Sequence, residues 1–154
     1  MYLLIEELPP ADAVPAAGAQ SDILELDWHE TGKSIIRAQS IHGRDIALRL
    51  LHENQHLHHD MPIFARDDLF IRIAVRPCPV IVLSPQTLPD TARACYEIGN
   101  KHAPLFIDGN ELLLPDDEPM FQWLQSAGFS PRREMRRLSN ALRSNSAHSH
   151  HHEH

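Results

Sequence analysis

Histidine is the residue type in this chain best suited to chemistry, because it makes up 12 of 154 residues and is concentrated at the C-terminus. Five histidines lie in the last seven positions, namely His148, His150, His151, His152 and His154. Imidazole binds nickel, copper, zinc and cobalt, and an ordinary pKa of about 6.5 leaves most histidines neutral at neutral pH. The segment therefore predicts metal binding without a defined geometry and without indicating which metal. A purification tag is the alternative, and the interleaved Ser149 and Glu153 argue against it.

A second candidate is His102, in the run Gly99-Asn100-Lys101-His102-Ala103-Pro104-Leu105. This run follows a predicted helix and leads into a predicted strand. A histidine at a helix C-terminus can interact with the negative end of the helix dipole, can be hydrogen-bonded as a structural residue, or can bind a metal. Position alone leaves these three readings open.

Other histidine, cysteine and glutamate residues give weaker signals. The cluster His56-Leu57-His58-His59-Asp60 is either a solvated turn or an auxiliary metal site, since a strand would place His56 and His58 on one face. Glu97 is either a solvated helix residue or an oxygen ligand. Cys95 lies on the apolar stripe of its predicted helix and is expected in the core. Cys78, between two prolines, is read as linker, and neither cysteine indicates a nucleophile.

The N-terminal half of the chain, residues 1–78, is predicted to be a β-rich domain. Its short apolar runs alternate with polar residues and are separated by turn residues, a pattern typical of a small antiparallel sandwich or barrel. His42-Gly43-Arg44 lies between two such runs and predicts a hairpin turn.

Residues 79–138 change rhythm and predict the order β-α-β-β-α-β, which is ferredoxin-like. The expected strands and helices cover residues 80–83, 88–101, 105–107, 111–114 and 116–127, with a last strand from Phe129. Asp90 is expected to cap the first helix, and Gly99-Asn100 to supply the positive φ at its end. Asp108-Gly109-Asn110 predicts a hairpin turn. With the β-rich domain, the fold class is α+β.

From Ser139 onward the chain is rich in Ser, Asn, Ala and His, and after Leu142 only Ala147 is apolar. Residues 139–154 are therefore predicted to form a disordered His-rich tail.

Composition excludes several classes of function. A formal net charge of −7 lacks the basic footprint of a nucleic-acid-binding protein. No run approaches the ~20 apolar residues of a membrane helix, and the N-terminal apolar run is too short for a signal peptide. We expect a cytoplasmic protein without nucleic-acid or membrane partners. The usual P-loop, Gly-x-Ser-x-Gly and His-Glu-x-x-His signatures are absent from the sequence, which favours a protein that is not an enzyme.

The run from Gly99 to Leu105 resembles the Gly-Asn-(Arg/Lys)-His-x-Pro signature of the urease accessory nickel chaperones, the UreE family. The resemblance extends to the order of parts, with a β-rich partner-binding domain, a ferredoxin-like metal-binding and dimerisation domain and a His-rich C-terminus. It implies that His102 lies at a homodimer interface, where two copies bind one Ni²⁺ across the two-fold axis. Zn²⁺ and Cu²⁺ are able to occupy the same sites.

The resemblance implies a nickel metallochaperone that delivers Ni²⁺ through a GTPase-containing accessory complex to apo-urease. Pairing of two dimers around one metal is left open. The chain departs from some family members at Glu111-Leu112-Leu113-Leu114, where leucines replace extra histidines. Auxiliary binding must then depend on the tail. The alternative is a nickel or zinc storage protein with no dedicated client.

Overall fold

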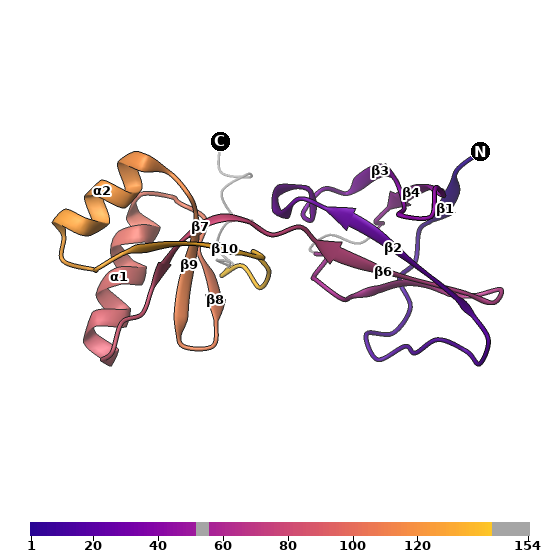
Figure 1. Cartoon of the computed structure of the whole chain (residues 1–154), viewed down its shortest axis with the longest axis horizontal. Coiled ribbons are helices and arrows are strands. Elements are labelled where there is room, and N and C mark those ends of the chain that lie inside the picture. The colour runs from indigo at the N-terminus through magenta and orange to yellow at the C-terminus, as the bar shows by residue number, and fades with distance from the viewer. Residues whose placement is uncertain (52–55, 143–154) are drawn as a thin grey trace, which may run out of the picture. The chain divides into compact units, whose positions relative to one another are not determined.

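The computed structural model describes residues 1–51 and 56–142. It divides the chain into two units, Met1–Pro77 and Cys78–His154 (Figure 1). The first is built of strands and the second of two helices and a sheet, so the α+β fold class is confirmed. Among the described residues, neither α-helix has the length and apolar character that a membrane crossing requires.

Unit 1 contains two three-stranded sheets that share one hydrophobic core. One sheet has the order β1-β4-β3 and the other β2-β6-β5. The elements are β1 (Leu3–Ile5), β2 (Gln20–Leu26), the 3₁₀ turn η1 (Trp28–Glu30), β3 (Ile35–Gln39), β4 (Asp45–Arg49), β5 (Pro62–Arg66) and β6 (Leu69–Val75). The expected hairpin around Gly43 is confirmed, with Gln39 opposite Asp45 and φ of Gly43 at 85°.

The prediction of an antiparallel sandwich or barrel holds for the β3–β4 and β5–β6 pairs of unit 1 and is wrong for two others. β1 pairs with β4 in parallel, and β2 pairs with β6 in parallel. Alternation of apolar and polar residues predicts which face of a strand is buried, but it carries no information on which distant strand lies beside it. Parallel neighbours need a long connection, and the intervening strands supply it here.

A buried carboxylate joins the two sheets of unit 1. Asp22 on β2 is only 1% exposed, and it accepts hydrogen bonds from Ser40 Oγ at 2.5 Å and Arg44 Nη1 at 2.7 Å. The backbone N–H groups of Ile23 and His42 also donate to Asp22. Burial raises the pKa of Asp22, but these hydrogen bonds outweigh burial and hold the pKa below its ordinary value. Asp22 therefore fixes the β3–β4 hairpin onto β2 as a carboxylate.

Unit 2 has the element order expected from the sequence. The elements are β7 (Cys78–Leu83), α1 (Leu88–Asn100), β8 (Phe106–Asp108), β9 (Glu111–Pro115), α2 (Glu118–Ser126) and β10 (Arg132–Arg136). The sheet has the order β10-β7-β9-β8, and every neighbouring pair is antiparallel. Asp108 pairs with Glu111, which confirms the expected hairpin turn.

The helices of unit 2 pack on one face of its sheet (Figure 1). Alternate residues of β7 and β9 enter a core with both helices; its buried members are Ile81, Leu83, Ala94, Ile98, Leu105, Leu112, Leu114 and Leu124. Thr87, not Asp90, is the N-cap of α1, because the Thr87 hydroxyl accepts the N–H of Asp90. Asp117 caps α2 in the same way.

The opposite face of the sheet carries an ion-pair network. Arg132 and Arg136 of β10 bind Glu111 at the start of β9, and Arg136 also binds Asp108 at 2.6 Å and Glu134 at 2.9 Å. Hydrogen bonds from Arg136 and Arg132 lower the pKa of Glu111. The end of β10 is thereby held against the β8–β9 hairpin.

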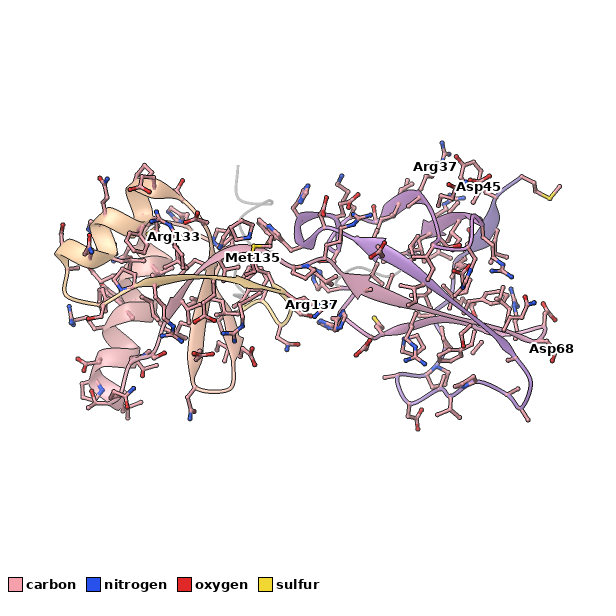
Figure 2. The ribbon with its side chains drawn as sticks, in the orientation of Figure 1. Arg37, Asp45, Asp68, Arg133, Met135 and Arg137 are labelled. Atoms are coloured by element: carbon pink, nitrogen blue, oxygen red, sulfur yellow. The ribbon has the colours of Figure 1, made fainter. Side chains whose placement is uncertain are left out.

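The next arginine of β10 has a different set of contacts. Arg133, labelled in Figure 2, lies toward α2, where it pairs with Glu118 and stacks on Phe121 with 3.9 Å between its guanidinium carbon and the ring centroid. Arg133 also pairs with Asp116 at 3.0 Å. These contacts secure α2 to the edge strand of the sheet.

Candidate metal site

His102 occupies a specialised position at the end of α1. Lys101 is the C-cap, with φ of −88°, and His102 follows with φ of 57° in the left-handed region. The N–H of His102 donates to the carbonyl of Gly99 at 3.0 Å, and the N–H of Ala103 donates to that of Ile98 at 3.4 Å. This pair of bonds is the Schellman motif, in which the left-handed residue is usually glycine.

Helix α2 ends with the same pair of bonds and shows the usual choice of residue. Gly128 has φ of 86° and donates to Gln125 at 3.1 Å, and Phe129 donates to Leu124 at 3.0 Å. Two equivalent turns in one unit therefore carry glycine in one case and histidine in the other. Because the left-handed conformation costs an L-residue about 1 kcal/mol or more, His102 is held at a position that backbone stability alone would give to glycine.

The expected site of positive φ, at Gly99 and Asn100, is wrong. Both residues continue α1 to its last turn, and the reversal falls at His102. Glycine permits a left-handed conformation but does not require it. The helix instead ends where Ile98, fully buried, and the half-buried Ala103 both reach the core. The signal for this boundary was Pro104, since proline commonly follows a helix end within three residues.

The side chain of His102 is exposed to solvent. Within residues 1–51 and 56–142, no side chain or backbone group hydrogen-bonds its imidazole, so its ring nitrogens remain available to a ligand from outside the described part of the chain. The structural reading of His102 as a hydrogen-bonded residue therefore has no support among these residues. The negative end of the α1 dipole, directly before it, favours a bound cation.

The backbone on both sides of His102 is anchored. Ile98 is 0% exposed and Leu105 is 6% exposed, and both belong to the core of unit 2. Lys101 packs its ammonium 4.3 Å from the ring centroid of Trp123 on α2, a cation–π contact. The turn that displays His102 is therefore attached to both helices and to the start of β8.

In the described part of the chain, no group of three or more His, Cys, Asp or Glu residues is arranged to hold a metal ion, and His102 belongs to no such group. The five C-terminal candidates lie outside the described residues; they are His148, His150, His151, His152 and His154. One imidazole supplies too few bonds for tight binding, so a metal held at His102 needs further donors.

The histidine cluster of residues 56–60 does not have the arrangement that a metal site on a strand would need. Residues 56–60 form no strand, so the facing arrangement of His56 and His58 that a strand would give is absent. His59 accepts the N–H of Val75 through Nδ1 at 3.1 Å, which places its remaining proton on Nε2 in the neutral form. His59 therefore uses Nδ1, the ring nitrogen that a metal would otherwise bind, for a hydrogen bond to the end of β6.

The prediction for Cys95 is confirmed, and the prediction for Cys78 is wrong. Cys95 is half-buried against the core of unit 2, as expected, and burial raises the pKa of its thiol. Cys78 is not linker, because it opens β7 and lies opposite Arg136 of β10. Flanking prolines are compatible with a strand when they stand at its first residues or on an edge.

Comparison with known proteins gives a consistent result along the whole chain. Residues 5–76 match the model of the UreE urease accessory protein N-terminal domain, and residues 78–154 match that of its C-terminal domain. The chain belongs to the UreE family of urease accessory proteins. It is 57% identical to the urease accessory protein UreE of Actinobacillus pleuropneumoniae over 131 residues, which is 85% of this chain and 70% of the relative.

Two other relatives agree with this assignment. UreE of Haemophilus influenzae strain PittEE is 58% identical over 125 residues, covering 81% of this chain and 68% of the relative. UreE of Flavobacterium johnsoniae is 42% identical over 123 residues, covering 80% and 74%. The chain is therefore an accessory protein of urease maturation and not an enzyme.

Proposed function

We propose that this UreE-family chain is a nickel metallochaperone that binds Ni²⁺ at His102 and on its His-rich tail and delivers the ion for assembly of the urease active site. The observation that carries the proposal is the left-handed, solvent-exposed His102 in a turn whose counterpart on α2 uses glycine. A backbone that tolerates this conformation for an imidazole is typical of a functional position.

A homodimer would complete the site. A two-fold axis beside His102 would bring two imidazoles to one ion, since an isologous interface duplicates every group near its axis. In this proposal unit 2 is a ferredoxin-like metal-binding and dimerisation domain, and pairing of two dimers would give four imidazoles. Unit 1 is the partner-binding domain. Few protein ligands with exchangeable water suit a carrier that has to release its ion.

The tail histidines would capture Ni²⁺ first, because five closely spaced imidazoles offer several overlapping sets of ligands, between which an ion exchanges quickly. The ion would then pass to His102 and on to the urease accessory GTPase and the apo-urease accessory complex in the cytoplasm. Zn²⁺ and Cu²⁺ would occupy the same imidazoles when they are available, since nitrogen sites follow the Irving–Williams order.

Titration calorimetry with light scattering tests this function on a chain cut after Ser144. We expect one tightly bound Ni²⁺ per dimer, or per two dimers, and loss of this site in the His102→Gly variant. His58→Ala is the matched control, because His58 is also an exposed histidine and should leave the stoichiometry unchanged. Equal nickel binding by the cut chain and its His102→Gly variant would refute the role of His102.

The same titration distinguishes a nickel chaperone from the alternative, a storage protein. No binding by the cut chain would place all of the metal on the tail. Failure of the full chain to bind the urease GTPase would further favour storage without a client. A complex with the GTPase that strengthens when Ni²⁺ is added would support delivery.

A further inference from the structure

Residues 140–142 form a short strap on the outer edge of β8. Ala141 pairs with Phe106 in an antiparallel bridge. The N–H of Leu142 donates to the carbonyl of Leu105 at 2.7 Å, and the N–H of Ile107 donates to the carbonyl of Asn140 at 3.4 Å. The prediction that the chain lacks order from Ser139 onward is therefore wrong for these residues, because a free sheet edge supplies backbone partners that composition does not reveal.

The strap is approached by a well-anchored segment. β10 and β8 are opposite edges of the sheet, so the chain passes from one edge to the other between Arg136 and residue 140. Arg136 begins this passage with its bonds to Asp108 and Glu111, and Leu138 is 1% exposed. Asn140 then adopts φ of 64°, a left-handed turn that brings the backbone alongside β8.

This arrangement determines where the tail is attached. Leu142 lies opposite Leu105, which is the end of β8 nearer in sequence to His102. Leu105 follows His102 by three positions, so the two Cα atoms are at most about 11 Å apart. His148 follows Leu142 by six positions, a span of up to about 20 Å. The first tail histidine is therefore within reach of His102 from this attachment.

We propose that residues 140–142 are a positioning strap, which attaches the tail beside His102 so that metal passes between the tail and that site within one chain. The proposal rests on the proposed function of His102. Without the strap the last buried anchor is Leu138, and the tether to His148 lengthens from six to ten residues. The effective concentration of His148 at His102 falls with about the −3/2 power of the tether length. Loss of the strap should therefore lower this concentration about twofold through the longer tether alone.

The strap's shorter hydrogen bond can be removed by a single substitution at Leu142. Leu142→Pro deletes the N–H that donates to Leu105, whereas Leu142→Ala keeps the N–H and removes the same exposed side chain, which makes it the matched control. Both variants are made in the full chain carrying His102→Gly, so that the tail is studied apart from the domain site. Less than one equivalent of Cu²⁺ is added as a paramagnetic ion that imidazoles bind strongly.

The measurement is the paramagnetic broadening of the backbone amide signals of residues 102, 103 and 105–107, since Pro104 has no amide proton. We expect broadening in the parent and in Leu142→Ala, and at least a twofold weaker effect in Leu142→Pro. Asn140→Pro and Asn140→Gly provide a second pair, because proline cannot adopt the positive φ that glycine accepts readily. Circular dichroism checks that each variant is folded.

If the signals broaden equally in Leu142→Pro and Leu142→Ala, and equally in Asn140→Pro and Asn140→Gly, the proposal that residues 140–142 position the tail is refuted. Because His102 is absent from these proteins, this result does not depend on whether His102 binds nickel. The nickel titration of the chain cut after Ser144 decides that separate question. The two proposals can therefore fail separately. If the signals broaden only when the strap is intact, but the cut chain binds no nickel, the proposal for the strap stands and the proposal of a nickel site at His102 is refuted.

Discussion

Replacing His102 by glycine should make the metal-free protein more stable while removing its nickel site. The φ of His102 is 57°, and the left-handed conformation costs an L-residue roughly 1–2 kcal/mol. Glycine avoids that cost but has a more flexible unfolded chain, which takes back roughly 0.5–1 kcal/mol. The net gain in the free energy of unfolding should be about 0.5–1 kcal/mol. His102→Ala should give no such gain, because alanine keeps the strained backbone.

The same reasoning predicts the opposite sign at the end of α2. Gly128 has φ of 86°, and a Cβ added there would meet no atom within 4 Å. Gly128→Ala should therefore lose about 0.5–1 kcal/mol through backbone conformation alone, without an effect on nickel stoichiometry. This variant is the matched control, since it occupies the equivalent position in the second helix.

Urea unfolding measures these differences. It should be done with a chelator present and at one fixed protomer concentration, because a bound metal or a dimer contact stabilises the folded state by mass action. A His102→Gly variant that is less stable than the parent would refute the reasoning. That result would mean that the imidazole makes a structural contribution larger than the backbone cost, as a dipole partner of α1 would.

Three other outcomes are expected. Asp22→Asn should lower the free energy of unfolding by about 2 kcal/mol, whereas Asp45→Asn, at an exposed carboxylate on β4, should change it little. Because the pKa of Asp22 is lowered on folding, its contribution is complete above the ordinary carboxyl pKa and is lost as pH falls through the folded value; urea unfolding at a series of acidic pH values in both proteins checks the sign. Glu111→Gln should cost less than about 1 kcal/mol, and thermal unfolding at low and high salt should show that the loss shrinks with screening. Lys101→Met should lose about 0.5–1 kcal/mol with its contact to Trp123, whose fluorescence should shift; an unchanged spectrum would argue against the contact.

Local structure in unit 2 could be predicted from the sequence because its signals are local. The turn at Asp108-Gly109-Asn110 needs only residues that accept positive φ between two apolar runs. The first turn of α2 needs only an acidic N-cap, which Asp117 supplies. The order of strands and helices followed from changes of period along the chain, and His102 emerged as a candidate from a short run that resembles the UreE signature.

Other features depended on contacts between distant residues. The parallel pairing of β1 with β4 and of β2 with β6 was not predictable, because period two marks a buried face but not a partner strand. The strap of residues 140–142 reads as polar tail in sequence, and only the open edge of β8 gives it structure.

The metal site shows the same division. The residue types of the histidines indicate transition-metal chemistry by themselves, since ligand preference is a property of the side chain. The conformation of His102 was decided by tertiary structure, because α1 ends where Ile98 and Ala103 can both pack on the core. That packing moves the left-handed position from Gly99 and Asn100, where sequence placed it, to His102, and so exposes the imidazole on an anchored turn.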